Sequence, residues 1–253
     1  MELKSQATRR LAPEMDPLRM GMGWTAEDLE KPQVLIEAPM GRATRAAPIC
    51  FSLPKKPPKP RTGRSQIRPV LCHRYVRRHE PGHDGGNYSL VSRDTIANLI
   101  EIHANATTFD AGVFISSCDK SVPAQLMAIG RINIPSIVVT GGVMEAGPDL
   151  LTLEQIGKYS AMFQRGEITQ EQFTFYKHHA CPSCGACSFM GTASTMQIMA
   201  EALGLMLPGS ALMPATCEDL VEVARKAGAR AAQMAVEGVT ARDIVTEKAL
   251  RTR

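Results

Sequence analysis

The fold is decided by residues 109–142, which read FDAGVFISSCDKSVPAQLMAIGRINIPSIVVTGG. Two runs rich in β-branched residues, 109–117 and 134–142, flank a helical segment that runs from Ala124 to Gly130, with Pro123 at its first position. A strand, a helix and a second strand in this order form a βαβ unit with parallel strands and a right-handed crossover. The sequence therefore predicts an α/β fold built on a parallel sheet.

Three chemically capable side chains, Cys118, Asp119 and Lys120, come directly after the first predicted strand. Loops at the carboxyl ends of parallel strands form binding sites, so we expect this thiol, carboxylate and amine at the mouth of one. The alternative is an ordinary strand-to-helix loop, in which Asp119 or Ser121 caps the helix and Lys120 is solvated.

A second cysteine-rich segment, residues 179–205, reads HACPSCGACSFMGTASTMQIMAEALGL. Cys181, Cys184 and Cys187 follow C-x-x-C spacing, and thiolates are ligands for zinc, copper(I) or iron–sulfur clusters. Such a site needs a fourth ligand from elsewhere, and buried or incidental cysteines are the alternative interpretation.

A helix is predicted directly after this cysteine loop, because one apolar stripe recurs at helical spacing. The stripe consists of Thr192, Met196, Met199 and Leu203. The N-terminus of a helix carries unpaired N–H groups and a positive dipole end, which favour thiolates and bound anions.

The composition is that of a globular α/β protein. The 253 residues could form one large domain or two small ones, and they carry a net charge of +4. Seven cysteines form an odd set, and neither a signal peptide nor a long apolar run is present. We therefore expect free or metal-bound thiols in a reducing cytoplasm, with no membrane segment.

Residues 41–81 differ from the rest of the chain. No acidic residue occurs from Gly41 to His79, and six prolines exclude a long helix or a central strand. We predict that 41–81 is disordered, between an N-terminal extension that begins the domain (1–40) and the main domain (82–253). A basic nucleic-acid-binding arm is the alternative, but the segment lacks interleaved aromatic residues.

The remaining helices are predicted from caps and spacing. Ser92 caps a helix that continues to about residue 106, and a helix rich in Ala and Val runs from about 218 to 234. Capping boxes begin at four threonines, and an αα-hairpin turns near Gly166 with its aromatic residues used for packing. These threonines are Thr25, Thr152, Thr169 and Thr240.

Three long blocks together resemble one enzyme family: GHDGGNYSLVSRD (82–94), CDKSVPAQLMAIGRINIPSIVVTGGVM (118–144) and HACPSCGACSFMGTASTMQIMAEALGLMLPGSALMPA (179–215). The sequence is similar to the dihydroxy-acid and sugar-acid dehydratases, which are iron–sulfur hydro-lyases. MGWTAEDLEKP (22–32) and GACSFMGTASTM (185–196) look closest to the bacterial D-xylonate dehydratase branch. The resemblance spans roughly residues 20–40 and 82–253, and implies the N-terminal portion of such an enzyme, without the family's C-terminal domain.

The resemblance implies the chemistry of the site. Cys118 and Cys187 look like ligands of an iron–sulfur cluster, [2Fe–2S] or [4Fe–4S], while Asp119 and a carbamylated Lys120 look like ligands of Mg²⁺. Cys181 and Cys184 then become neighbours of the site. A small sugar acid would lose water to give a 2-keto-3-deoxy acid. The family is usually homo-oligomeric, its members are not expected to bind nucleic acid, and its catalytic base lies in the C-terminal domain, so the chain alone is expected to be inactive.

One block departs from the family pattern. Residues 77–83 read RRHEPGH, and Arg77 stands where the family has a metal-binding carboxylate six residues before His83. A cation there opposes Mg²⁺. We therefore hypothesise that residues from about 41 to 80 are translated out of frame. Two alternative functions stay open: a dihydroxy-acid dehydratase of branched-chain amino-acid synthesis, and a non-catalytic zinc- or nucleic-acid-binding module.

Overall fold

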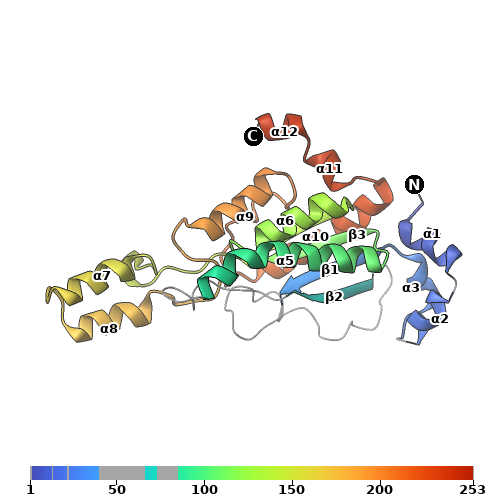
Figure 1. The fold of residues 1–253 in the computed structure, drawn as a ribbon. Helices are drawn as coiled ribbons and strands as arrows, with labels where there is room; N and C mark the ends of the chain where they lie inside the picture. The colour runs from blue at the N-terminus through green and yellow to red at the C-terminus, as the bar shows by residue number, and fades with distance from the viewer. Residues whose placement is uncertain (1, 13, 22, 40–65, 73–84, 253) are drawn as a thin grey trace.

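The computed structural model describes residues 2–12, 14–21, 23–39, 66–72 and 85–252 (Figure 1). Its centre is a parallel sheet of four strands in the order β2-β1-β3-β4. The strands are β1 (Gln33–Pro39), β2 (Gln66–Cys72), β3 (Ala111–Ser116) and β4 (Ser136–Thr140). The predicted α/β fold with a parallel sheet is confirmed.

The βαβ unit forms as predicted. β3 leads through α6 (Ser121–Ile132) to β4, and the two strands pair in register from Gly112 opposite Ser136 to Ser116 opposite Thr140. The helix begins earlier than expected, so that Pro123 is its third residue. Every residue of β3 and β4 is buried, which explains why both strands read as almost continuous apolar runs.

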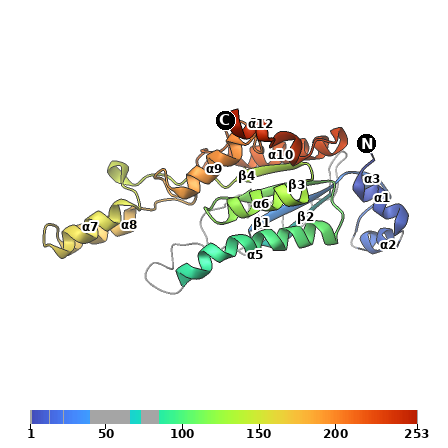
Figure 2. The ribbon, with the colours of Figure 1, turned by 45° about the horizontal axis from the view of Figure 1, so that its top comes forward.

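Helices cover both faces of the sheet, as Figure 2 shows. Leu35, Phe114 and Val138 pack under α5 (Gly85–Ala106), α6 and α9 (Thr192–Ala202). Strand neighbours with the opposite side-chain direction, such as Val113 and Val139, pack against α10 (Asp219–Glu237). The alternation of side chains along each strand thus divides the core into two layers.

Three short helices precede the sheet: α1 (Lys4–Leu11), α2 (Met15–Met20) and α3 (Ala26–Glu30). The buried carboxylate of Asp110 holds the first of them, because it accepts hydrogen bonds from Ser5 N at 2.8 Å, Ser5 Oγ at 2.6 Å and Gln33 N at 2.7 Å. The carboxylate therefore joins α1 to the beginning of β1 and β3.

The predicted αα-hairpin consists of α7 (Gln155–Gln164) and α8 (Gln170–His179), preceded by the short 3-10 helix η2 (Pro148–Leu150). Gly166 lies in the turn with φ +72°. Figures 1 and 2 both show the hairpin projecting away from the sheet and its covering helices. At the other end of the chain, α11 (Ala241–Ile244) and α12 (Glu247–Thr252) follow α10.

The capping boxes predicted at Thr25, Thr169 and Thr240 are present. At Thr152 only half of the box forms: its N–H donates to Gln155, while α7 begins two residues later than the box requires. The prediction for Ser92 is wrong, because α5 begins at Gly85 and Ser92 lies inside it.

Two further expectations need correction. Residues 66–72, within the segment expected to lack regular structure, form β2. This strand is at the edge of the sheet, where Pro69 is tolerated because one side of an edge strand needs no hydrogen-bond donor. In α9 the buried residues are Ser194, Gln197 and Ala200, whereas Met199 of the predicted apolar stripe is 43% exposed.

Candidate functional site

The site begins where β3 ends. Cys118 is buried there, and its carbonyl accepts a hydrogen bond from Val122 N in the first turn of α6. The preceding hydroxyl, Ser117 Oγ, accepts a hydrogen bond of 2.7 Å from Gly141 N, just after β4. The ends of two adjacent strands are therefore tied together behind Cys118, as expected for a binding loop at the carboxyl edge of a parallel sheet.

Asp119 is the centre of a small polar network. Its Oδ2 accepts from Lys120 Nζ at 2.5 Å and from Thr192 Oγ1 at 2.9 Å, while Oδ1 accepts from Cys118 Sγ at 3.3 Å. Burial alone would raise the pKa of Asp119, but the hydrogen bonds from Lys120 and Thr192 outweigh it and the pKa is lowered. The carboxylate is therefore ionised at neutral pH.

The expected alternative for this loop, a simple helix cap with a solvated lysine, is not what the structure has. Lys120 occupies the N-cap position of α6, no side chain caps the helix, and Lys120 is only 6% exposed. A buried lysine held against a partly buried carboxylate costs desolvation energy that a surface loop would avoid. This arrangement favours a functional interpretation of Asp119 and Lys120.

The cysteine loop is held by a three-stranded set of backbone contacts. Val143 makes parallel bridges to Ala186 on one side and to Pro214 on the other. Met144 N donates to Ala186 O at 2.7 Å, and Ala186 N donates to Gly142 O at 2.9 Å. These bonds fix the backbone immediately before Cys187.

The two predicted ligand segments meet at Thr192. This residue begins α9, five positions after Cys187, and its hydroxyl reaches Asp119 across 73 residues of sequence. Ser194 Oγ donates to Cys187 O at 3.4 Å, which connects the helix back to the loop. The N-termini of α6 and α9 thus converge on the Cys118–Lys120 loop and the Cys187 loop.

Thr192 was missed as a site residue, because the sequence identified it only as the beginning of a helix. The available signal was its position: a hydroxyl at the first turn of a helix directly after a cysteine loop. Its contact with Asp119 depends on the packing of α9 beside α6, which no local pattern reveals.

Buried polar atoms next to both ligand segments lack hydrogen-bond partners among the described residues. They are Ser121 Oγ, directly after Lys120, and Ser188 Oγ, directly after Cys187. An unsatisfied buried hydroxyl costs about 1–3 kcal/mol unless water or a ligand completes it. Among the described residues, these two hydroxyls therefore have hydrogen-bonding capacity left for water or a polar ligand.

The side chains at the site differ in how well they suit the two implied groups, the iron–sulfur cluster and Mg²⁺. Neither Cys118 nor Cys187 forms a disulfide, and thiol ligands suit iron, but no three His, Cys, Asp or Glu side chains within the described ranges lie close enough to hold a metal ion. The three loop cysteines therefore do not form the compact metal knuckle that their spacing suggested. Asp119 suits Mg²⁺, whereas Lys120 as an ammonium does not. Arg77 lies outside the described residues.

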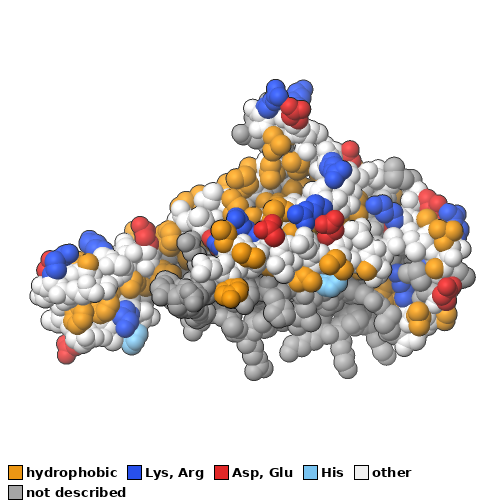
Figure 3. All heavy atoms as spheres, in the orientation of Figure 1, with side chains coloured by type: hydrophobic (Ala, Val, Ile, Leu, Met, Phe, Trp, Pro, Cys, Tyr) orange, Lys and Arg blue, Asp and Glu red, His pale blue; other side chains and the backbone are white. Residues whose placement is uncertain are grey.

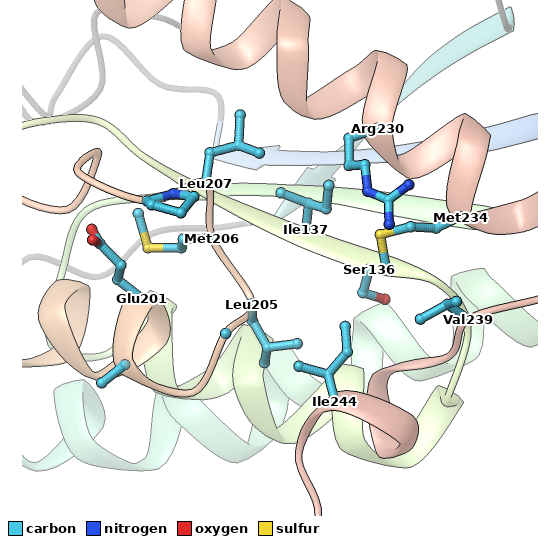
Figure 4. Close-up of a pocket in the computed structure, with 13 residues that line it drawn as sticks. Ser136, Ile137, Glu201, Leu205, Met206, Leu207, Arg230, Met234, Val239 and Ile244 are labelled. Carbon is cyan, nitrogen blue, oxygen red and sulfur yellow. The ribbon is translucent and has the colours of Figure 1, made fainter. Parts of the chain in front are cut away.

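A pocket of about 560 Å³ lies at the other end of the strands from the Cys118–Lys120 loop (Figure 4). It opens beside Ser136, at the beginning of β4, and its lining is mostly apolar. Its charged groups are already paired: Glu201 accepts hydrogen bonds from two backbone N–H groups, and Arg230 donates to Glu237. The pocket therefore offers little to a polar substrate.

None of the described helices is both long and apolar enough to cross a lipid bilayer.

Comparison with known proteins gives matches over the region that contains the Cys118–Lys120 loop and the Cys187 loop. The family described as "Dihydroxy-acid/6-phosphogluconate dehydratase N-terminal" matches residues 78–252. Similar relatives, each named "Dihydroxy-acid dehydratase", come from Nitratidesulfovibrio vulgaris strain DP4 (44% identical over 175 residues), Caldanaerobacter subterraneus subsp. tengcongensis (45% over 175) and Clostridium beijerinckii (42% over 175). Each alignment covers 66% of this chain and 31% of the relative.

The chain thus spans about a third of the length of the curated relatives it matches, and the match includes both ligand segments. The predicted resemblance is confirmed: the chain belongs to the dihydroxy-acid/6-phosphogluconate dehydratase family, a family of hydro-lyases, and carries its N-terminal domain.

Proposed function

We propose that this chain is the cluster-binding part of a hydro-lyase that converts a 2,3-dihydroxy acid to a 2-keto acid. The observation that carries the proposal is the hydrogen bond from Thr192 to Asp119, which joins the Cys118–Lys120 loop to the Cys187 loop within the region that matches the family. In the net reaction the substrate loses the C2 proton and the C3 hydroxyl as water, and the enol becomes the ketone.

Cys118 and Cys187 would hold an iron–sulfur cluster through their thiolates, with further ligands outside the described residues. The cluster would supply a Lewis acid for the departing hydroxyl. Thr192 orients the Asp119 carboxylate, and the tether at Ser117 holds the backbone of Cys118 in place.

Asp119 and Lys120 would bind Mg²⁺ only after a change at the lysine. As an ammonium, Lys120 donates to Asp119 and repels a cation. Carbamylation of its amine would replace this donor with an oxygen ligand of the kind that Mg²⁺ prefers. The position of Lys120 supports this step, because its amine lies beside the Asp119 carboxylate, which would supply the second oxygen ligand.

For the substrate we favour a sugar acid resembling D-xylonate. The unsatisfied hydroxyls of Ser121 and Ser188 support a ligand rich in hydroxyl groups, since a site with buried polar groups discriminates against an apolar analogue. The names of the relatives support the alternative, a branched-chain dihydroxy acid. Either substrate fits a homo-oligomeric enzyme of the cytoplasm.

Anaerobic reconstitution of the chain with iron and sulfide tests the proposal. We expect bound iron together with acid-labile sulfide, reduced in C118S and C187S and retained in the matched control C181S. Stoichiometric zinc without sulfide, together with salt-sensitive nucleic-acid binding, would instead support the non-catalytic module. Adding D-xylonate or 2,3-dihydroxyisovalerate and following the visible absorption of the cluster then separates the two substrates.

The hypothesis that residues 41–80 are out of frame belongs to the same proposal. Its support is the arginine at position 77, where the family has a carboxylate. Reading the coding DNA in its other frames tests it: a family-like segment with an acidic residue near position 77 is expected, and the hypothesis fails if no frame contains one.

A further inference from the structure

Two cysteines of the cysteine loop have no role in the proposed function. Cys181 and Cys184 are half-buried and form no disulfide, and neither is one of the proposed cluster ligands. They follow C-x-x-C spacing, but Cys184 and Cys187 follow the same spacing, so the sequence allows two overlapping pairs. The backbone between the cysteines is held differently in the two pairs, and this difference determines which pair can close to a disulfide.

The backbone between Cys184 and Cys187 is held firmly by the segment after β4. Both polar backbone groups of Ala186 are bonded to residues 142–144, its N–H at 2.9 Å and its carbonyl at 2.7 Å. A Cβ built on Gly185 would lie 2.5 Å from backbone atoms of the same segment, so this part of the loop has no room to shift. Bringing these two sulfurs to the bonding distance of about 2.05 Å would therefore break backbone hydrogen bonds.

The backbone between Cys181 and Cys184 is held only through a side chain. Within the described part of the chain, none of residues 181–184 takes part in a backbone-to-backbone hydrogen bond. Ser183 supplies the anchor instead, because its Oγ accepts from Glu145 N at 2.8 Å and donates to Cys184 O at 3.1 Å. The chain also bends at Ser183 and Cys184. Closing a ring across this bend therefore leaves the backbone hydrogen bonds of the loop in place.

Both thiols of this first pair can be reached from solvent. Cys181 and Cys184 are half-buried, in contrast to Cys118, which is only 8% exposed. Cys184 Sγ lies 3.9 Å from the carbonyl oxygen of Ala215, which is a weak hydrogen bond because S–H is a poor donor. Figure 3 shows side chains of the hydrophobic group, which includes cysteine, at the surface where the hairpin of α7 and α8 joins the body of the molecule. A small reagent can therefore approach this end of the loop.

We propose that Cys181 and Cys184 are a reversible redox pair, which closes to a disulfide by exchange with a small disulfide such as glutathione disulfide, while Cys187 stays reduced. The thiolate of one cysteine attacks a sulfur of glutathione disulfide, the S–S bond breaks, and one glutathione leaves and takes up a proton. The second cysteine, as a thiolate, then attacks the sulfur of the first, and the other glutathione leaves.

The exchange is balanced without any further reactant. Two electrons and two thiol protons pass from the cysteine pair to glutathione disulfide, which becomes two molecules of glutathione. The disulfide uses both spare thiols of the loop and leaves Cys187 available as a ligand. The redox pair does not depend on the proposed function, because its formation requires neither iron nor substrate.

Anaerobic incubation of the full 253-residue chain with glutathione disulfide, without iron, tests the proposal. The remaining thiols are then alkylated, and peptide mass spectrometry identifies the pair from the cysteine that carries the alkyl label. In the folded chain the disulfide between Cys181 and Cys184 is expected in at least about tenfold excess over that between Cys184 and Cys187, because the second would cost two backbone hydrogen bonds. In urea the two rings have equal length and are expected within about threefold of each other.

Serine variants identify the partners. In C181S the thiol of Cys184 is expected to keep one glutathione as a mixed disulfide, because no second thiol displaces it. C217S is the matched control, since Cys217 is also half-buried and lies two residues after Ala215, and it should retain the disulfide. Far-UV circular dichroism confirms that each variant is folded. The absence of an internal disulfide, a folded chain with the same ratio of pairs as in urea, or loss of the disulfide in C217S would each overturn the proposal.

Discussion

Replacing Gly185 by alanine should detach the cysteine loop from the segment after β4. Gly185 has φ +120°, a conformation that costs a residue with a side chain about 1–2 kcal/mol. An added Cβ would also lie 2.5 Å from Met144 N and 2.5 Å from the carbonyl carbon of Val143, both of them backbone atoms that cannot rotate away.

Relieving this overlap requires the loop to move and lengthens the two hydrogen bonds that join Ala186 to Gly142 and Met144. At about 1 kcal/mol for each bond, the total loss for G185A is roughly 3–4 kcal/mol. For a chain of this size that corresponds to a fall in Tm of about 10 °C. Urea denaturation followed by circular dichroism measures the free energy of unfolding.

Gly166 supplies the matched control. It also has a positive φ, +72°, but an added Cβ would have no neighbouring atom within 4 Å. G166A should therefore lose only the conformational part, about 1–2 kcal/mol. In G185A alone, the thiols of the loop should also react faster with an alkylating reagent. Equal losses of stability in the two variants, or unchanged thiol reactivity in G185A, would refute the close approach as the cause.

Three further changes have defined outcomes. D110A should lower the free energy of unfolding by about 3–5 kcal/mol, because three buried donors lose one carboxylate, and proteolysis should then release the first three helices. D16N should lower the free energy of unfolding by about 0.5–1 kcal/mol at neutral pH, because Arg9 donates a hydrogen bond to the Asp16 carboxylate. This hydrogen bond lowers the pKa of Asp16 below its ordinary value of 3.8, so the stabilisation is present above pH 3.8 and disappears as the pH falls through the lower folded value. Below that pH the two proteins should unfold alike. T192V removes a hydrogen bond to the Asp119 carboxylate, so amide exchange in the first turn of α9 should become about tenfold faster, and T192S should restore it.

The parallel sheet could be predicted because the local pattern and the tertiary requirement agree. Strands buried on both faces favour β-branched and aromatic residues, and the sequence has them at 113–115 in β3 and at 137–140 in β4. The position of Cys118, Asp119 and Lys120 at the carboxyl edge followed from the topology alone.

The predictions from sequence failed where tertiary packing, and not the local pattern of apolar residues, decides which side chains are buried or in contact. The buried side of α9 carries Ser194, Gln197 and Ala200, while Met199 is left partly in solvent. The apolar stripe predicted for α9 was therefore only partly right: Met196 and Leu203 pack against the core, whereas Thr192 and Met199 are exposed. The contact of Thr192 with Asp119 was unpredictable for a related reason: it depends on how two helices lie side by side.

The chain leaves the body of the molecule and returns to it at almost the same point. An added Cβ on Gly147 would lie 2.3 Å from the carbonyl oxygen of His179, so the two ends of the hairpin are in contact. Because the ends already meet, a longer or shorter excursion changes the closure entropy by only about 0.6 kcal/mol for each doubling of length. Evolution could therefore lengthen, trim or exchange this excursion, and with it the surface that it presents, while the cysteine loop beside Met144 stays in place.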